Sequence, residues 1–400
     1  IVEWEHAMRP LDSVQQAIVA KKSIVEPSQR YDKIMEIIRN RNFNADRYLP
    51  VLNIHVKAEE MLKIRARILP LPQITYRGQN NQDIVEYVTF GKWIIRNQFC
   101  STSVINKWDM IYFGTKPDAN IIEILKISEQ QLPSITHTTS SKKISSIAAI
   151  LGSCDPSCSR YAARLCEQYP KKDRCSIEII KEMDKMIIDL LKVYARSCGN
   201  TLPNRIVFYR DGVDDGQFQK VLDNEVNKIK TACQVVYGNN PLPKLTFIIV
   251  KKRHNTRFFA YDGQNTSNIE AGTVVDLDIT NPSQFDFYLC SQAAIKGTSR
   301  PALYHVLHDE NEFSSDDIQQ LTYWLCHTDV RCSKSVSIPA PVHYAHLAAY
   351  ASHAYEFDHS DDEILESEND KDQGELITLE DIKTKLIILN NDIQDTMWFV

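Results

Sequence analysis

The feature that most constrains this chain is an alternation of apolar runs and amphipathic segments in its second part. Residues 147–151, 205–209 and 245–250 are apolar runs of strand length, and residues 178–194 and 217–233 place their apolar side chains on one face of a helix. Strands that alternate with helices predict an α/β sheet, whose functional site lies at the carboxyl ends of the strands. We therefore expect the chemistry of the chain to follow the ends of these runs.

The first part of the chain predicts a less regular, mixed domain. Residues 28–39 have helical spacing, and no structure is predicted for residues 1–25. Extended pieces are expected at residues 51–56, 64–71, 92–99 and 104–113. At the other end, residues 379–389 predict a final helix, and the bulky apolar residues 397–400 predict that the C-terminus docks into the body.

The charge of the chain is concentrated in one segment and does not exclude a nucleic-acid partner. The whole chain carries −6, but residues 356–375 hold ten acidic residues and one lysine, which gives −9 there and leaves +3 elsewhere. This acidic segment predicts a solvated loop.

Ten scattered cysteines without a Cys-x-x-Cys pair indicate reduced thiols. Because the chain shows neither a secretory signal nor an apolar run of the roughly 18 residues that span a membrane, we expect a cytoplasmic protein.

Several motifs occur in an order and spacing that resemble one known family. They are Ile206 to Gly212 with Gly216-Gln217-Phe218, Lys252 to Arg257, Phe285 to Cys290, Gly297 to Pro301, and Cys326 to Leu347. Together they resemble the PIWI domain of the Argonaute family, and residues 42–48 and 93–99 resemble its second linker. The resemblance divides the chain into residues 1–25 (unassigned), 26–115 (second linker), 116–133 (a remnant of the MID domain) and 134–400 (PIWI).

This resemblance implies an α/β fold in which an RNase H-like PIWI domain follows a mixed linker domain. It also implies RNA cleavage with two Mg²⁺ ions, in which Asp211, Glu178 and His346 match the catalytic positions. Asp211 and His346 match metal ligands, and a carboxylate at the end of an apolar strand suits Mg²⁺. Each residue also has a structural interpretation, Asp211 and Glu178 as groups at helix N-termini and His346 as a structural histidine.

The sequence departs from the family where the first catalytic aspartate is expected. The matching stretch is Ser134-Ile135-Thr136-His137, and a serine hydroxyl supplies no charge to hold two dications together. Residues 128–133 are largely polar and end in proline, so they predict a poor central strand, and the apolar residues 121–127 are a surrogate for it. Ala351 stands where the family has a basic residue near the 5′ phosphate of the guide, and we expect no PAZ domain and no complete MID domain. We therefore expect an incomplete catalytic site and no cleavage of RNA.

Basic residues after the strands predict the RNA-binding surface that the resemblance implies. Such side chains hold sugar and phosphate without reading sequence. The residues are Lys252, Arg253, His254, Arg257, Arg300, Arg331 and Lys334, with Ser337. Without the resemblance, solvated surface charge would explain them equally well. His305, His308 and Asp309 are a further cluster of metal-ligand types, but the family carries this strand without metal.

Three functions are compatible with these residues. The first is an Argonaute-like RNA-binding protein of small-RNA-guided silencing that does not cleave, with a small guide RNA and a target RNA as partners. The second is a guide-directed, Mg²⁺-dependent RNA endonuclease, which requires a carboxylate in place of Ser134. The third is a protein-interaction module that holds no guide and binds GW-repeat-type silencing proteins. The sequence does not choose between the first and the third.

Overall fold

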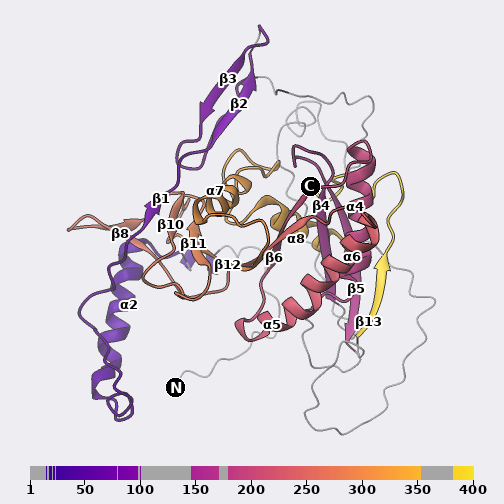
Figure 1. Cartoon of the computed structure of the whole chain (residues 1–400). Helices are drawn as coiled ribbons and strands as arrows, with labels where there is room; N and C mark the ends of the chain where they lie inside the picture. Colours follow the sequence, from indigo (N-terminus) through magenta and orange to yellow (C-terminus); the bar gives the residue numbers. More distant parts are fainter. Residues whose placement is uncertain are drawn as a thin grey trace.

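The body of the protein is built on two β-sheets (Figure 1). The computed structural model describes residues 24–97 except residue 79, residue 100, and residues 146–170, 179–352 and 382–400, together with single positions before residue 24. Within these residues, one sheet has six strands and the other has three. Ser134, Glu178 and the acidic residues 356–375 lie outside the described residues, as do residues 104–113 and 121–133.

The six-stranded sheet carries the strands predicted at residues 205–209 and 245–250. In spatial order its strands are β1 (Arg67–Ile68), β10 (Thr273–Val275), β11 (Asp286–Cys290), β12 (Ala302–Asp309), β7 (Lys244–Lys251) and β6 (Arg205–Asp211). β6 and β7 run parallel, and the other pairs are antiparallel. Every residue of β7 from Leu245 to Val250 is buried, because helices cover both faces of the sheet.

Helices cover the two faces of this sheet with separate apolar cores. On one face lie α4 (Met183–Ser197), α5 (Phe218–Val221), the π-helical turn η3 (Leu222–Val226) and α6 (Asn227–Tyr237). On the other lies α7 (Ser315–Leu325), whose first turn is capped by the hydroxyl of Ser314. The helices predicted at residues 178–194 and 217–233 are confirmed, although α4 begins at Met183 and the second contains the π-helical turn.

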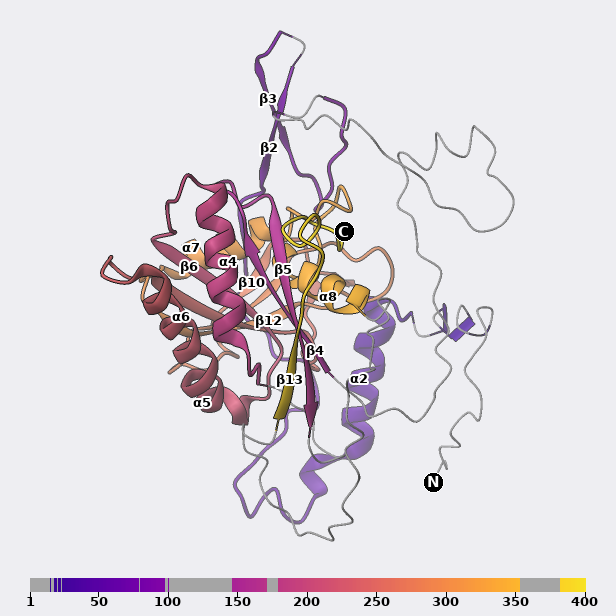
Figure 2. The same ribbon diagram turned by 90° about the vertical axis from the view of Figure 1, so that its right-hand side faces the viewer.

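The three-stranded sheet stands beside β6 and holds the strand predicted at residues 147–151. Its order is β13 (Ile382–Ile387), β5 (Tyr161–Pro170) and β4 (Ser146–Ser153), all antiparallel. Figure 2 shows α4 on one side of these strands and α8 (Ala340–Ser352) on the other. Alternate residues of β5 therefore enter different cores: Ala162 and Cys166 pack with α4, whereas Tyr161 and Leu165 pack with α8.

The linker region is only partly as predicted. The helix predicted at residues 28–39 is confirmed as α2 (Pro27–Arg41), which the 3-10 turn η1 (Phe43–Ala45) follows. The pieces predicted at residues 51–56 and 92–99 form no regular strand where the structure describes them: residues 51–53 form a turn, and Lys92 makes only isolated bridges. Two hairpins were not predicted: β2 (Gln73–Arg77) with β3 (Asp83–Tyr87), and β8 (Phe259–Tyr261) with β9 (Thr266–Asn268).

The helix predicted at residues 379–389 is wrong, because residues 382–387 form β13. This strand pairs with β5 along its whole length, from Ile382 opposite Pro170 to Ile387 opposite Leu165. The hydroxyl of Thr384 also donates to Glu182 Oε1 at 2.8 Å. The apolar spacing suited a helix, but an open edge of β5 and β-branched residues favour a strand.

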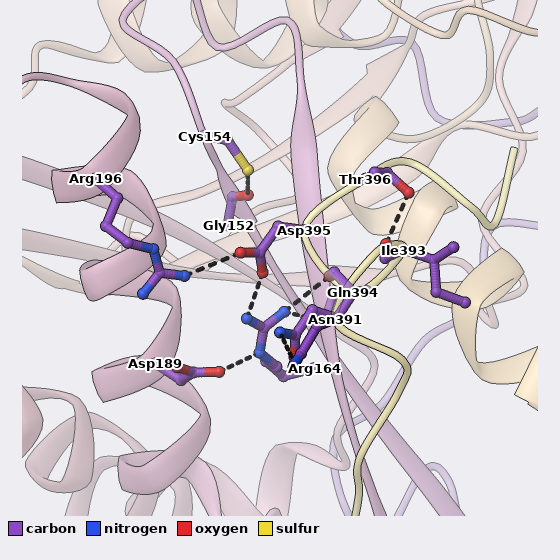
Figure 3. A network of polar contacts seen from close by, with 11 residues as sticks. Gly152, Cys154, Arg164, Asp189, Arg196, Asn391, Ile393, Gln394, Asp395 and Thr396 are labelled. Atoms are coloured by element: carbon purple, nitrogen blue, oxygen red, sulfur yellow. Dashed lines mark hydrogen bonds and ion pairs between the residues drawn. The ribbon is translucent and has the colours of Figure 1, made fainter.

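The C-terminus docks into the body, as its apolar residues predicted. Phe399 is buried in the core beneath α8, where its ring lies 5.9 Å from that of Tyr344. A polar network fixes the preceding turn (Figure 3): Arg164 donates to Asp395 Oδ1 at 2.7 Å and to the carbonyl of Gln394 at 2.9 Å, and it also binds Asp189.

We expect Arg164→Ala to lower the free energy of unfolding by about 2 kcal/mol, because it removes charge-assisted hydrogen bonds from a side chain that is only 11% exposed. Arg196 binds the same aspartate, at 2.9 Å, but is 56% exposed, so Arg196→Ala should cost less than about 1 kcal/mol. Urea unfolding of both variants makes the comparison. Equal losses would contradict an anchoring role for Arg164.

Candidate functional site

The predicted catalytic carboxylate Asp211 lies at the carboxyl end of β6. It pairs in parallel register with Val250 of β7, and the next amide, that of Gly212, donates to the Val250 carbonyl at 2.8 Å. Gly212 has φ +34°, a conformation that glycine adopts without a steric penalty, so the chain can turn sharply away from the sheet. The 3-10 turn η2 (Asp215–Gln217) follows and leads into α5. Asp211 is thus held at the end of a paired strand, directly before a turn.

The structure brings the predicted residues Asp211 and His346 into contact. Nε2 of His346, on α8, lies 3.0 Å from Asp211 Oδ2. The ammonium of Lys252, just after β7, lies 2.7 Å from the same ring nitrogen and 3.4 Å from Asp211 Oδ1. One ring nitrogen cannot donate to the carboxylate and accept from the ammonium at the same time, so only one of these two hydrogen bonds forms at once.

The environment of Asp211 favours its charged form. Burial alone would raise the pKa of Asp211, but the hydrogen bond and charge of His346, with Lys252, outweigh burial and hold this pKa below its ordinary value of 3.8. A carboxyl group whose pKa is lowered by folding stabilises the fold above its unfolded pKa, and that contribution is lost as the pH falls through the folded pKa. Asp211 is therefore an anion at neutral pH.

A cleft of about 680 Å³ opens beside this triad. β4 lines it with residues 146–150 and β6 with residues 208–211, while α8 contributes Ala345, His346 and Ala349. The wall is fixed by a buried ion pair, in which Arg210 lies 3.1 Å from Oε1 of the fully buried Glu225. The same oxygen accepts the amide of Ile180 at 3.1 Å, which ties the start of the α4 region to the end of β6.

The described residues do not by themselves fit a two-metal site. Among them, no group of three or more His, Cys, Asp or Glu side chains is arranged to hold a metal ion. Asp211 and His346, the predicted ligands, supply one carboxylate and one imidazole. The ammonium of Lys252 contacts both side chains. Two Mg²⁺ ions about 3.5–4 Å apart need more anionic oxygens than this. Glu178 and Ser134, the other two predicted positions, fall outside the described residues.

The predicted RNA-binding residues near the cleft do not all face solvent. Lys252 and Arg253 are exposed and line the cleft. His254 is half-buried: its Nε2–H donates to the carbonyl of Pro301 at 2.9 Å, its ring packs on Tyr288, and burial lowers its pKa. In this structure His254 therefore fixes the loop, while Lys252 and Arg253 present charge to solvent.

A second group of predicted residues is joined by one that the sequence did not indicate. Burial lowers the pKa of Arg257, and the positive charges of Arg300 and Arg30 lower it further, so the charges of these three residues act on one another. Arg30, on α2, is positioned by donating to Thr298 Oγ1 at 3.1 Å. No linear signal pointed to Arg30, because it stands far from the PIWI-like motifs in sequence. The three arginines raise the positive potential of this part of the surface.

The loop between α7 and α8 carries the third group. Arg331 and Lys334 are exposed there, and Lys92 of the linker region pairs with Lys334 in an isolated bridge. The linker is fastened to this loop by the amide of Trp93, which donates to the Ser333 carbonyl at 3.1 Å. Ser337 is half-buried in the segment that leads into α8. The sequence did not single out Lys92.

Three residues of β12, His305, His308 and Asp309, each contact a different partner outside this strand. Nδ1 of His305 lies 2.5 Å from Asp286, and Nε2 of His308 lies 3.1 Å from Glu310. Asp309 accepts the amide of Phe313 at 2.9 Å and a hydrogen bond from the Thr246 hydroxyl, which is 2.5 Å away. These contacts join neighbouring strands and loops, so the three side chains have structural roles.

Comparison with known proteins agrees with the fold. The Piwi domain family matches residues 133–355, more than half of the chain. The chain belongs to the Argonaute family through this Piwi domain. Protein argonaute 7 of Arabidopsis thaliana is 49% identical over 211 residues, which are 52% of this chain and 20% of that protein. The predicted α/β fold with an RNase H-like Piwi domain is thereby confirmed.

Two solved Argonaute structures are similar to this one. Kluyveromyces polysporus Argonaute, in a crystal structure with a guide RNA, is 29% identical with a TM-score of 0.52, over 65% of this chain and 29% of that chain. The C-terminal lobe of a budding yeast Argonaute is 27% identical with a TM-score of 0.51, over 64% of this chain and 53% of that one. The Piwi-domain chain thus spans between a fifth and about half of these relatives. No helix in the described residues is long and apolar enough to cross a membrane.

Proposed function

We propose that this Piwi-domain chain binds the sugar-phosphate backbone of a guide RNA or its target in small-RNA-guided silencing in the cytoplasm, and does not cleave it. The observation that carries the proposal is the pair of exposed cations, Lys252 and Arg253, at the mouth of the cleft where β6 and β7 end. Ligands of open α/β sheets bind at this edge. The arginine group of Arg30, Arg257 and Arg300 extends the positive surface, and a relative of similar fold was crystallised with a guide RNA.

We propose that the chain does not cleave RNA because the described residues of the cleft supply too few ligands for two metal ions. The Argonaute family generally uses Mg²⁺ for cleavage, but in the structure the ammonium of Lys252 lies 3.4 Å from Asp211 Oδ1, and its positive charge opposes a metal ion there. The Mg²⁺-dependent endonuclease is the alternative, and it needs a further carboxylate from outside the described residues. A module that binds GW-repeat-type proteins without a guide is the other alternative.

Binding of single-stranded RNA across a range of salt concentrations separates an RNA-binding function from the module without a guide. With about five phosphates contacted, affinity should fall by about 100-fold between 50 and 200 mM salt, because each contact releases counterions. RNAs of unrelated sequence should bind with equal affinity, since backbone contacts carry no sequence information. Fluorescence anisotropy with labelled RNA measures both quantities. An affinity too weak to detect at 50 mM salt would favour the module without a guide.

A further inference from the structure

The linker region meets the loop between α7 and α8 in a short antiparallel bridge, in which Lys92 pairs with Lys334. The hydrogen bonds on either side join their neighbours: the amide of Trp93 donates to the Ser333 carbonyl at 3.1 Å, and the amide of Ser335 to the Gly91 carbonyl at 2.7 Å. A pair flanked in this way has Cα atoms only about 4.5 Å apart, and its side chains lie close together. The two lysine side chains therefore leave the same face of the bridge next to each other.

The opposite face of the bridge is packed against the Piwi domain. Side chains alternate between the two faces of paired strands, so Trp93 and Ser335 point away from the lysines. Ser335 is buried, and the ring of Trp93 lies 6.0 Å from that of His327. Lys92 and Lys334 are exposed. The inner face thus anchors the bridge, and the outer face presents two ammonium groups to solvent.

A tight turn holds Lys92 in this position. Thr89 and Lys92 exchange two hydrogen bonds of 3.0 Å, and the two residues between them, Phe90 and Gly91, have φ values of 51° and 68°. Positive φ at both positions is the pattern of a type I′ turn, which closes a two-residue hairpin. A Cβ atom at Gly91 would also collide with Ser335 Oγ. Glycine is therefore needed here both for the backbone conformation and for the close approach of the linker to the loop.

The charges of the bridge are not balanced within the protein. Among the described residues, neither ammonium group has a carboxylate partner, whereas Lys251 and Lys252 each lie against an aspartate. Like charges directly opposite one another across paired strands destabilise the pairing. A phosphate group bound by both cations would remove this repulsion and gain charge-assisted hydrogen bonds. The bridge thus has the charge and the exposure of a phosphate-binding site.

We propose that Lys92 and Lys334 together bind the phosphate backbone of RNA, so that the linker region forms part of the RNA-binding surface. This inference rests on the proposed function and adds to it a residue from outside the Piwi match at residues 133–355. RNA is the polyanion that the position favours, because Lys334 lies in the segment that leads into α8, and α8 lines the cleft that carries other exposed cations. Such a contact adds affinity without a preference for sequence.

Fluorescence anisotropy with labelled single-stranded RNA tests the pair in the whole chain. We expect Lys92→Ala to weaken binding about threefold at moderate salt, and to make the slope of log affinity against log salt shallower by about 0.7, as for one lost contact. Lys57→Ala is the matched control, because Lys57 is exposed in the same linker region and its loss changes the net charge equally. The control should bind RNA as tightly as the native chain.

Glycine variants test whether the linker turn positions Lys92. Gly91→Ala should weaken RNA binding as much as Lys92→Ala does, and Gly91→Ala/Ser335→Ala should restore part of the affinity, because the second change removes the oxygen that the new Cβ meets. Gly199→Ala is the control: its φ is 61°, and no atom lies within 4 Å of a Cβ there. It carries similar backbone strain without the collision. Equal losses in Gly91→Ala and Gly199→Ala would contradict the positioning role of the turn.

The outcomes separate this inference from the proposed function. If the native chain binds RNA and Lys92→Ala binds it equally well, the linker contact is wrong while the proposed function stands. A native chain that binds no RNA would overturn both. Lys92→Ala that loses affinity for polyglutamate, but not for RNA, would assign the pair to an acidic protein instead.

Discussion

Replacing Lys252, Arg253 and Lys334 together by alanine is expected to weaken binding of single-stranded RNA by about 30-fold at moderate salt. All three are exposed, and the first two stand at the mouth of the cleft. Losing three phosphate contacts should also make the slope of log affinity against log salt shallower by about 2, since each contact on a single strand contributes about 0.7. The loss should be equal for RNAs of different sequence, because backbone contacts do not read bases.

Lysines elsewhere on the Piwi-domain surface provide the matched control. Lys192, Lys244 and Lys385 are also exposed, and Lys244 begins β7 at the end opposite Lys251. Their triple alanine variant has the same net charge as the first one. It therefore distinguishes the loss of local contacts with RNA from a change in the electrostatic field of the whole protein. We expect it to bind RNA within about threefold of the native chain, because charges beyond about 10 Å are largely screened. Equal losses in the two variants would place the RNA elsewhere.

Local patterns predicted the parts of the fold that depend on neighbours in sequence. The apolar run that ends in Asp211 predicted both β6 and the carboxylate at its carboxyl end, and the run after it predicted β7. Motif matching then predicted that His346 would join Asp211, and the two side chains do make contact. These predictions succeeded because a strand buried on both faces has an unambiguous sequence pattern.

What the sequence did not predict depends on contacts between distant segments. β13 was predicted as a helix, because its apolar spacing does not show that it pairs with β5, a strand distant in sequence. Arg30 and Lys92 join the basic surface only because α2 and the linker fold against the Piwi domain. Lys252 was predicted to hold RNA, but its position between Asp211 and His346 follows from the packing of α8 beside β6 and could not be predicted.

We expect no Mg²⁺-dependent cleavage of a target RNA by this chain, even with a matched guide present. Two-metal cleavage requires one ion to activate water and another to stabilise the leaving oxygen, with shared carboxylates between them. Here Oδ2 of Asp211 is engaged by His346 at 3.0 Å, and Lys252 lies 3.4 Å from Oδ1. A divalent ion would have to displace this ammonium while gaining, from the residues that the structure describes, a single anionic ligand. Such a site should bind Mg²⁺ weakly and hold no second ion.

The measurement is the yield of cut target in the presence and absence of Mg²⁺, compared with target incubated without protein. We expect the three yields to be equal. The decisive comparison uses Asp211→Ala, which removes the carboxylate but leaves the exposed cations of the cleft in place. Mg²⁺-dependent product that disappears in this variant would show that Asp211 recruits further ligands from outside the described residues, and the chain would then be an endonuclease. RNA binding by the same variant separates the two activities: losing an anion from a surface that attracts phosphate should leave affinity unchanged or raise it.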